Sequence, residues 1–465
     1  MTGIITRRER IIDNEERQRV RLMKPPTDAQ RVQEWQPNDP AFWESTAKPI
    51  AWRTLWITTF CLLLSFSTWF MVSALVVKLS GIGFKFTPQE LFWLTAMPGL
   101  AAGTLRIVHT FLIPIFGTRK TVSISTLLLA IPCVGWGYAV MNPQTPLSTF
   151  LVLAFLAGLG GGNFSSFMPS TSLFFPKSKL GTALGIQAGI GNFGVSVAQF
   201  LIPAILGIAL VGSSQTFTNP KTGATSNIYL QNGALIWVPL VLLGAVVAWF
   251  GLRDVPVQAS FKEQLDIFKE KHTWIMTSLY IMTFGSFSGL AAAFPLMIKQ
   301  IYGGFDGAPD PLAFAFLGPL VGAGVRAAAG PVADKVGGAK VTMVSGIGML
   351  ACSIAILPFA NPGSMASWSG FLWLMLGIFF FSGIGNASTF KQIPMIFPPR
   401  QAGGVIGWTS AIAAYGPFAF SLILGAVLGS GRNGAPFFIG LAIFYVINIG
   451  LNWWFYSRKG AEKPC

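Results

Sequence analysis

The chain has 465 residues, of which 52% are hydrophobic and only 11% are charged. Soluble domains carry about 25% charged residues, so this composition excludes an ordinary soluble protein and indicates a helical membrane protein. The net charge of +15 does not indicate nucleic-acid binding, because the basic residues of the first 54 positions are interleaved with acidic ones.

Residues 1–54 are predicted to form a mixed-charge N-terminal tail. The tail has no continuous apolar core, so it is not a cleavable signal peptide. Within it, residues 35–43 contain two tryptophans and a phenylalanine. This segment is either a short amphipathic element at the membrane surface or part of a disordered tail.

Twelve apolar runs follow, each long enough to span a bilayer as a helix. Six precede a polar segment and six follow it: 55–77, 89–112, 121–141, 148–170, 181–210 and 234–252, then 274–298, 311–332, 341–360, 369–394, 402–429 and 435–456. We therefore expect an all-α polytopic membrane protein with 12 transmembrane helices in two pseudo-symmetric six-helix halves. The halves are predicted at 55–252 and 274–457, with a linker at 253–273 and a C-terminal tail at 458–465.

Lysine and arginine are distributed unevenly between the two sets of connections. Fourteen lie on one set and the C-terminal tail, and five lie on the other. Because positively charged loops stay inside, both termini are predicted to be cytoplasmic.

The two halves repeat in sequence. A shift of 220 places Arg106 on Arg326, and a shift of 222 places residues 175–176 on 397–398. Duplicated six-helix halves with a central substrate site are the organisation of major facilitator transporters. The segment 330–340 also resembles that superfamily's loop motif, GxxxD(R/K)xGx(R/K).

Glycine is concentrated in the predicted fifth and eleventh spans. Small residues allow neighbouring membrane helices to approach closely. These glycines are either gating positions, where the spans slide as the halves move, or sites of static packing; the candidates are Gly185, Gly189, Gly191, Gly194, Gly403 and Gly407.

Three cations are predicted within the spans, namely Arg106, Arg326 and Lys391, and no carboxylate is predicted in mid-span. Each such cation costs about 2.5–3.5 kcal/mol on insertion scales. The cargo is the best source of the missing negative charge, so the pattern favours an anion carrier over snorkelling or structural arginines. Two permanently charged arginines repel each other in an empty site, which favours exchange of one anion for another.

Two further side chains are candidates for coupling to protons. A buried lysine can lose its proton, so Lys391 permits proton symport. His109 lies one helical turn beyond Arg106 and is a second candidate, although a packed neutral histidine is the simpler interpretation.

The sequence resembles the NarK-type nitrate/nitrite porters of the major facilitator superfamily from residue 35 onward. The resemblance is most specific at 162–166 and 189–197, like the first nitrate signature, and at 383–390, like the second; 94–106 and 284–287 also match. It implies that nitrate or nitrite lies between two arginines and two phenylalanine rings, with three further polar contacts. These residues are Arg106, Arg326, Phe164, Phe284, Tyr280, Asn192 and Ser410.

The function expected is nitrate/nitrite antiport by a monomer in the lipid bilayer of a bacterial inner membrane. Proton symport through Lys391, transport of a small carboxylate and a non-transporting anion sensor are the alternatives. An enzyme is not expected, because two histidines and four scattered cysteines form no catalytic or metal-binding pattern. No cofactor and no nucleic-acid partner are expected.

Overall fold

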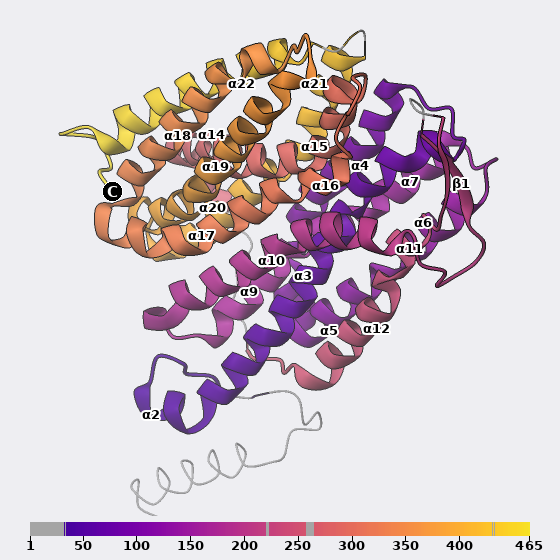
Figure 1. The fold of residues 1–465 in the computed structure, drawn as a ribbon. Helices are drawn as coiled ribbons and strands as arrows, with labels where there is room; N and C mark the ends of the chain where they lie inside the picture. Colours follow the sequence, from indigo (N-terminus) through magenta and orange to yellow (C-terminus); the bar gives the residue numbers. More distant parts are fainter. Residues whose placement is uncertain (1–31, 33, 220–222, 257–264, 430, 432) are drawn as a thin grey trace, which may run out of the picture.

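The computed structural model describes residues 32, 34–219, 223–256, 265–429, 431 and 433–465 (Figure 1). Twelve helices in these residues are long and apolar enough to cross a membrane, which confirms the predicted number. Most of the N-terminal tail and the middle of the predicted linker lie outside the described residues.

The first six spans are built from consecutive helical segments, and a short β-hairpin lies between the fifth and the sixth. The elements are α2 (Pro40–Phe42), η1 (Trp43–Ala47), α3 (Lys48–Leu79), η2 (Ser80–Ile82), α4 (Pro88–His109), α5 (Leu112–Leu128), α6 (Ala130–Met141), α7 (Leu147–Ala157), α8 (Leu159–Gly162), α9 (Phe164–Phe174), α10 (Lys177–Ile205), β1 (Gln215–Thr218), β2 (Thr225–Ile228), α11 (Asn232–Leu235) and α12 (Trp237–Gly251).

The last six spans follow the linker. The elements are η3 (Leu265–Lys269), α14 (Lys271–Tyr280), η4 (Ile281–Gly285), α15 (Ser286–Tyr302), α16 (Pro311–Ala315), α17 (Leu317–Val336), α18 (Gly338–Ala355), η5 (Leu357–Phe359), η6 (Met365–Ser367), α19 (Trp368–Ile396), α20 (Pro399–Ala413), α21 (Gly416–Leu428), α22 (Ala435–Asn452) and η7 (Trp453–Ser457).

The first and seventh spans lie at the centre of the bundle. In their most apolar windows 89% and 94% of the residues are buried, more than in any other span of the described chain. The seventh span contains a single π-helical turn, η4, between α14 and α15. Such turns often occur at functional sites in helices, and this one positions Phe284 one turn after Tyr280.

The first helix begins earlier than the apolar run predicted. Asp39 caps α2, and the span then continues from Pro40 to Ile82. The Trp35 indole N–H donates to the Leu173 carbonyl at 2.8 Å, and Trp43 is buried. Residues 35–43 therefore form an ordered element packed on the end of α9, rather than a disordered tail.

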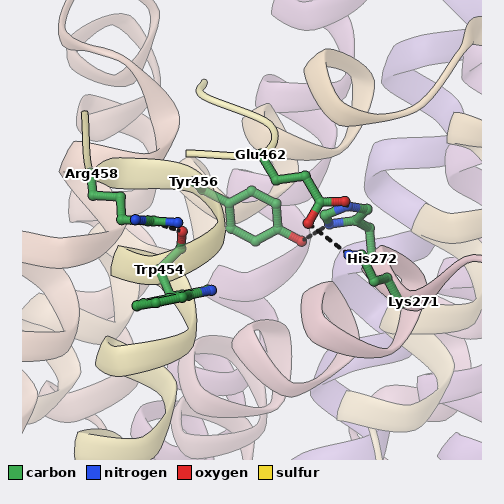
Figure 2. A network of polar contacts seen from close by, with 6 residues as sticks. All are labelled: Lys271, His272, Trp454, Tyr456, Arg458 and Glu462. Atoms are coloured by element: carbon green, nitrogen blue, oxygen red, sulfur yellow. Dashed lines mark hydrogen bonds and ion pairs between the residues drawn. The ribbon is translucent and has the colours of Figure 1, made fainter. Parts of the chain in front are cut away.

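The C-terminal segment folds back onto the start of α14 (Figure 2). Glu462 accepts hydrogen bonds from Lys271 at 2.7 Å and contacts His272 at 3.2 Å, while Tyr456 Oη lies 3.0 Å from His272 Nδ1. The Lys271 ammonium group holds the pKa of the Glu462 carboxyl below its usual value. These contacts fasten the segment after the last span to the start of the seventh.

Several polar contacts join the first six spans to the last six toward the end of the bundle that carries the hairpin. Lys299 Nζ donates to the Val77 carbonyl at 2.7 Å, and Lys78 forms an ion pair with Asp310 at 3.1 Å. The Gln199 amide donates to the Ala291 carbonyl at 2.8 Å. The two sets of spans are thus fastened together at the end opposite the C-terminal segment (Figure 1).

Candidate functional site

Arg106 lies on α4 in the middle of the bundle and is fully buried. Its Nε donates to the Gly161 carbonyl at 2.9 Å, and its Nη1 donates to the Ser410 carbonyl at 2.7 Å. Nη2 is buried and has no hydrogen-bond partner among the described residues. The guanidinium is therefore held on one side by the backbone and keeps unused donors on the other.

Aromatic rings surround this guanidinium. The Arg106 Cζ lies 4.6 Å from the centre of the Phe164 ring and 5.2 Å from that of Phe284. The Phe284 ring stacks on Tyr280 with 5.3 Å between centres and an interplanar angle of 6°. Cation–π contacts stabilise a buried guanidinium without neutralising it, so the charge stays available to an anion.

Arg326, on α17, supplies the second positive charge. It is 7% exposed, and its Nη1 is buried without a hydrogen-bond partner among the described residues. Tyr280 interacts electrostatically with both Arg326 and Arg106, and its hydroxyl faces the Arg326 guanidinium. The two repeat-related arginines therefore share one site, with unused donors on both.

The two remaining predicted polar residues, Asn192 and Ser410, differ in whether their side chains are already hydrogen-bonded. The side-chain amide of Asn192 is buried, and neither its oxygen nor its nitrogen has a partner in the described part of the chain. The hydroxyl of Ser410 instead donates to the Gly407 carbonyl at 2.9 Å. Ser410 thus contacts Arg106 through its backbone carbonyl, which the sequence interpretation did not anticipate.

Two residues on α19 were missing from the predicted site although both lie in the second signature. Asn386 is fully buried, and both of its amide atoms lack partners among the described residues. The Phe390 ring packs edge-on against Tyr280 at 4.6 Å and lies 5.5 Å from Arg326 Cζ. A shift of 223 places Asn163 on Asn386 and Phe167 on Phe390, so the internal repeat is the sequence feature that could have pointed to these two residues.

The expectation that Lys391 has no carboxylate partner is wrong. Lys391 Nζ lies 2.5 Å from Asp334 Oδ1, and the two side chains are 42% and 57% exposed. Successive residues of a helix point about 100° apart, so the Lys391 side chain points in a different direction from the Phe390 ring. Asp334 comes from the predicted superfamily motif at the end of α17.

His109 lies on the same helix as Arg106 and is mostly buried. Its Nδ1 is 2.9 Å from the Ser166 hydroxyl, and Arg106 is the charged group with which it interacts electrostatically. The predicted packing of this ring agrees with its burial.

The predicted gating glycines fall into two groups. On α10, a methyl group added to Gly194 would clash with the Leu63 carbonyl oxygen of α3, and one added to Gly191 would come within 2.7 Å of Leu62. The other four face the opposite half or open space: Gly189 faces Ala327 of α17, Gly407 faces Thr110 after α4, and Gly185 and Gly403 have no atom within 4 Å of the added methyl. Gly191 and Gly194 therefore serve close packing with α3.

Comparison with known proteins gives the family. The model of the Major Facilitator Superfamily matches residues 55–390. The chain is 60% identical to the "Probable nitrate/nitrite antiporter NarK2" of Thermus thermophilus, over 93% of this chain and 98% of that protein. It is 38% identical to the "Nitrate/nitrite transporter NarU" of Escherichia coli, over 92% and 96%. This chain belongs to the NarK-type porters of the major facilitator superfamily.

The fold agrees with solved transporters. A bacterial homologue of the human lysosomal transporter Spinster, in an inward-facing and unoccupied conformation, has a TM-score of 0.65 with 14% sequence identity. The match covers 87% of this chain and 96% of that one. It supports the 12-helix major facilitator fold.

Proposed function

We propose that this protein carries nitrate and nitrite across the membrane by alternating access, exchanging one anion for the other. One observation carries the proposal. Two buried arginines with unused donors, Arg106 and Arg326, share a site lined by the rings of Phe164, Phe284 and Tyr280. The names of the porters most similar in sequence point to the same substrates.

The chemistry of the site suits a small planar anion. Guanidinium groups bind flat oxyanions through parallel N–H···O bonds, and nitrate and nitrite are flat and singly charged. The aromatic faces offer little hydration, which favours a weakly hydrated ion over chloride or phosphate. Asn192 adds an amide whose donors and acceptor are free for the ligand in the described structure.

Exchange follows from the fixed charges. Arginine stays protonated when buried, so the empty site retains two positive charges without a carboxylate partner among the described residues. Moving both charges through the apolar middle of the protein is costly unless an anion accompanies them. The carrier then changes state when loaded, and influx of one anion is tied to efflux of another.

Alternation requires contacts that open at one end while the other end closes. The Lys299–Val77 and Lys78–Asp310 contacts fasten the hairpin end. With both termini in the cytoplasm, as the distribution of lysine and arginine favours, this is the outer end. The described state is then closed to the outside of a bacterial inner membrane.

We favour exchange over proton symport through Lys391, because that side chain is 42% exposed and paired with Asp334. The experiment that separates the remaining possibilities uses purified protein in liposomes, with neither a membrane potential nor a pH gradient. We expect labelled nitrate to enter only liposomes loaded with nitrite or nitrate. Uptake into empty liposomes would contradict exchange, and equal uptake of formate or acetate would contradict the substrate assignment.

A further inference from the structure

The ion pair between Lys78 and Asp310 joins the two sets of spans at the hairpin end, and its two partners are held differently. Asp310 is fixed at the start of α16, because its Oδ1 accepts from the Leu312 backbone N–H at 3.0 Å while its Oδ2 lies 3.1 Å from Lys78 Nζ. Lys78 has a long flexible side chain, and an ion pair contributes little when such a chain must be ordered to form it. The strength of this pair therefore depends on what restrains Lys78.

The ring of Phe217 in β1 restrains Lys78. The Lys78 Nζ lies 5.1 Å from the centre of this ring, within the range of a cation–π contact. The ring is half-buried and rests on Gly81 of η2, where an added methyl group would clash with the ring atoms. Phe217 thus packs on the end of the first span and contacts the ammonium group that binds Asp310.

The base of the hairpin is fastened to the first six spans. The Gln215 side chain donates to Gln231 Oε1 at 2.7 Å and accepts from the Leu230 backbone N–H at 2.9 Å. Gln231 is fully buried, and its Nε2 donates to the carbonyls of Val211 at 2.6 Å and Ser213 at 3.0 Å. An isolated two-stranded hairpin is only marginally stable in water, so these bonds keep β1 in place over the first span.

We propose that Phe217 is a positioning residue for alternating access: by holding Lys78 toward Asp310, it stabilises the conformation that is closed at the hairpin end. This inference rests on the proposed alternating access, and it does not depend on which anion is carried. A cation–π contact at an exposed site changes an equilibrium roughly two- to fivefold. Removing the ring should therefore raise the population that is open at the hairpin end by that factor.

Lys299 reports this opening in the native chain. Its Nζ donates to the Val77 carbonyl at 2.7 Å and to the Ser80 hydroxyl at 3.2 Å, both on the other set of spans. A water-soluble acylating reagent should therefore modify the Lys299 amine fastest when the hairpin end is open, and mass spectrometry of the digested protein gives the rate. Lys85, which is exposed at the same end, is the internal control for the reagent.

The test uses purified protein without nitrate. Phe217→Ala should label Lys299 roughly two- to fivefold faster than the native protein does, and Lys85 at the native rate. Gly81→Ala should have the same effect, because its methyl group displaces the ring and changes no charged group. Thr216→Ala is the matched control: neighbouring residues of a strand point to opposite faces, and Thr216 is exposed, so Lys299 should label at the native rate.

A double variant separates positioning of the ion pair from simple packing of the hairpin. Asp310→Asn keeps a side chain that caps α16 but removes the charge, so it should itself speed the labelling of Lys299. Adding Phe217→Ala to it should then have little further effect, because the ring acts through the pair.

Fully additive effects of the two substitutions, or labelling at the native rate in Phe217→Ala, would overturn this inference and leave nitrate exchange as proposed. Failure of the native protein to exchange nitrate in liposomes would instead overturn the proposed function, and the labelling rates would not reveal it. The two outcomes are therefore distinguishable.

Discussion

Replacing Arg326 with lysine tests whether the second guanidinium binds the anion. Lysine keeps the positive charge but loses the planar fork that can donate two parallel hydrogen bonds. Losing one charged hydrogen bond costs about 1.5–3 kcal/mol, which is roughly a 10- to 150-fold loss of nitrate affinity. Arg326 Nη1 has no hydrogen-bond partner among the described residues, so the unfolding temperature should stay close to that of the native protein.

The assay is nitrate titration followed by tryptophan fluorescence, since Trp69 lies 5.7 Å from Arg106 Cζ beside the site. Arg106→Lys is the matched comparison. It removes hydrogen bonds to the Gly161 and Ser410 carbonyls, so it should lower both nitrate affinity and the unfolding temperature. Nitrate affinity within twofold of native in Arg326→Lys would refute the two-arginine site.

Three further predictions concern packing, coupling and the C-terminal contact. Gly194→Ala should lower the unfolding temperature, because the added methyl clashes with the backbone of α3. In Gly189→Ala the added methyl lies 3.6 Å from Ala327 Cβ, an ordinary contact. This variant should unfold at the native temperature but exchange nitrate more slowly. Lys391→Gln should change exchange rates less than about twofold with or without a pH gradient, since a half-exposed ion pair contributes little. Glu462→Gln should lower the unfolding temperature at pH 7 but not near pH 3. Folding lowers the pKa of the Glu462 carboxyl, so its ionised form stabilises the folded protein at pH values above the pKa in the unfolded chain. This contribution is lost as the pH falls through the pKa of the folded protein.

The sequence alone pointed to the two arginines more directly than to the residues around them. Arg106 and Arg326 could be proposed from the sequence because arginine is rare within a membrane span and because the repeat relates them. Phe164 and Phe284 followed only from the family resemblance, since in a chain with forty phenylalanines no pattern separates a binding ring from a packing ring. The ion pair between Lys391 and Asp334 joins two different spans, so no pattern along the sequence predicts it.

The two arginines are held differently, and this difference bears on how the site binds. Arg106 is anchored to one carbonyl from each half, Gly161 on α8 and Ser410 on α20, and still keeps Nη2 unpaired in the described structure. Its orientation is fixed before any anion arrives, so little conformational entropy is lost on binding. Arg326 lacks a partner for Nη1 and belongs to a helix of the other half. An anion that joins Nη2 of Arg106 to Arg326 therefore adds a contact between the halves that the empty site lacks, and this ties the change of conformation to the presence of cargo.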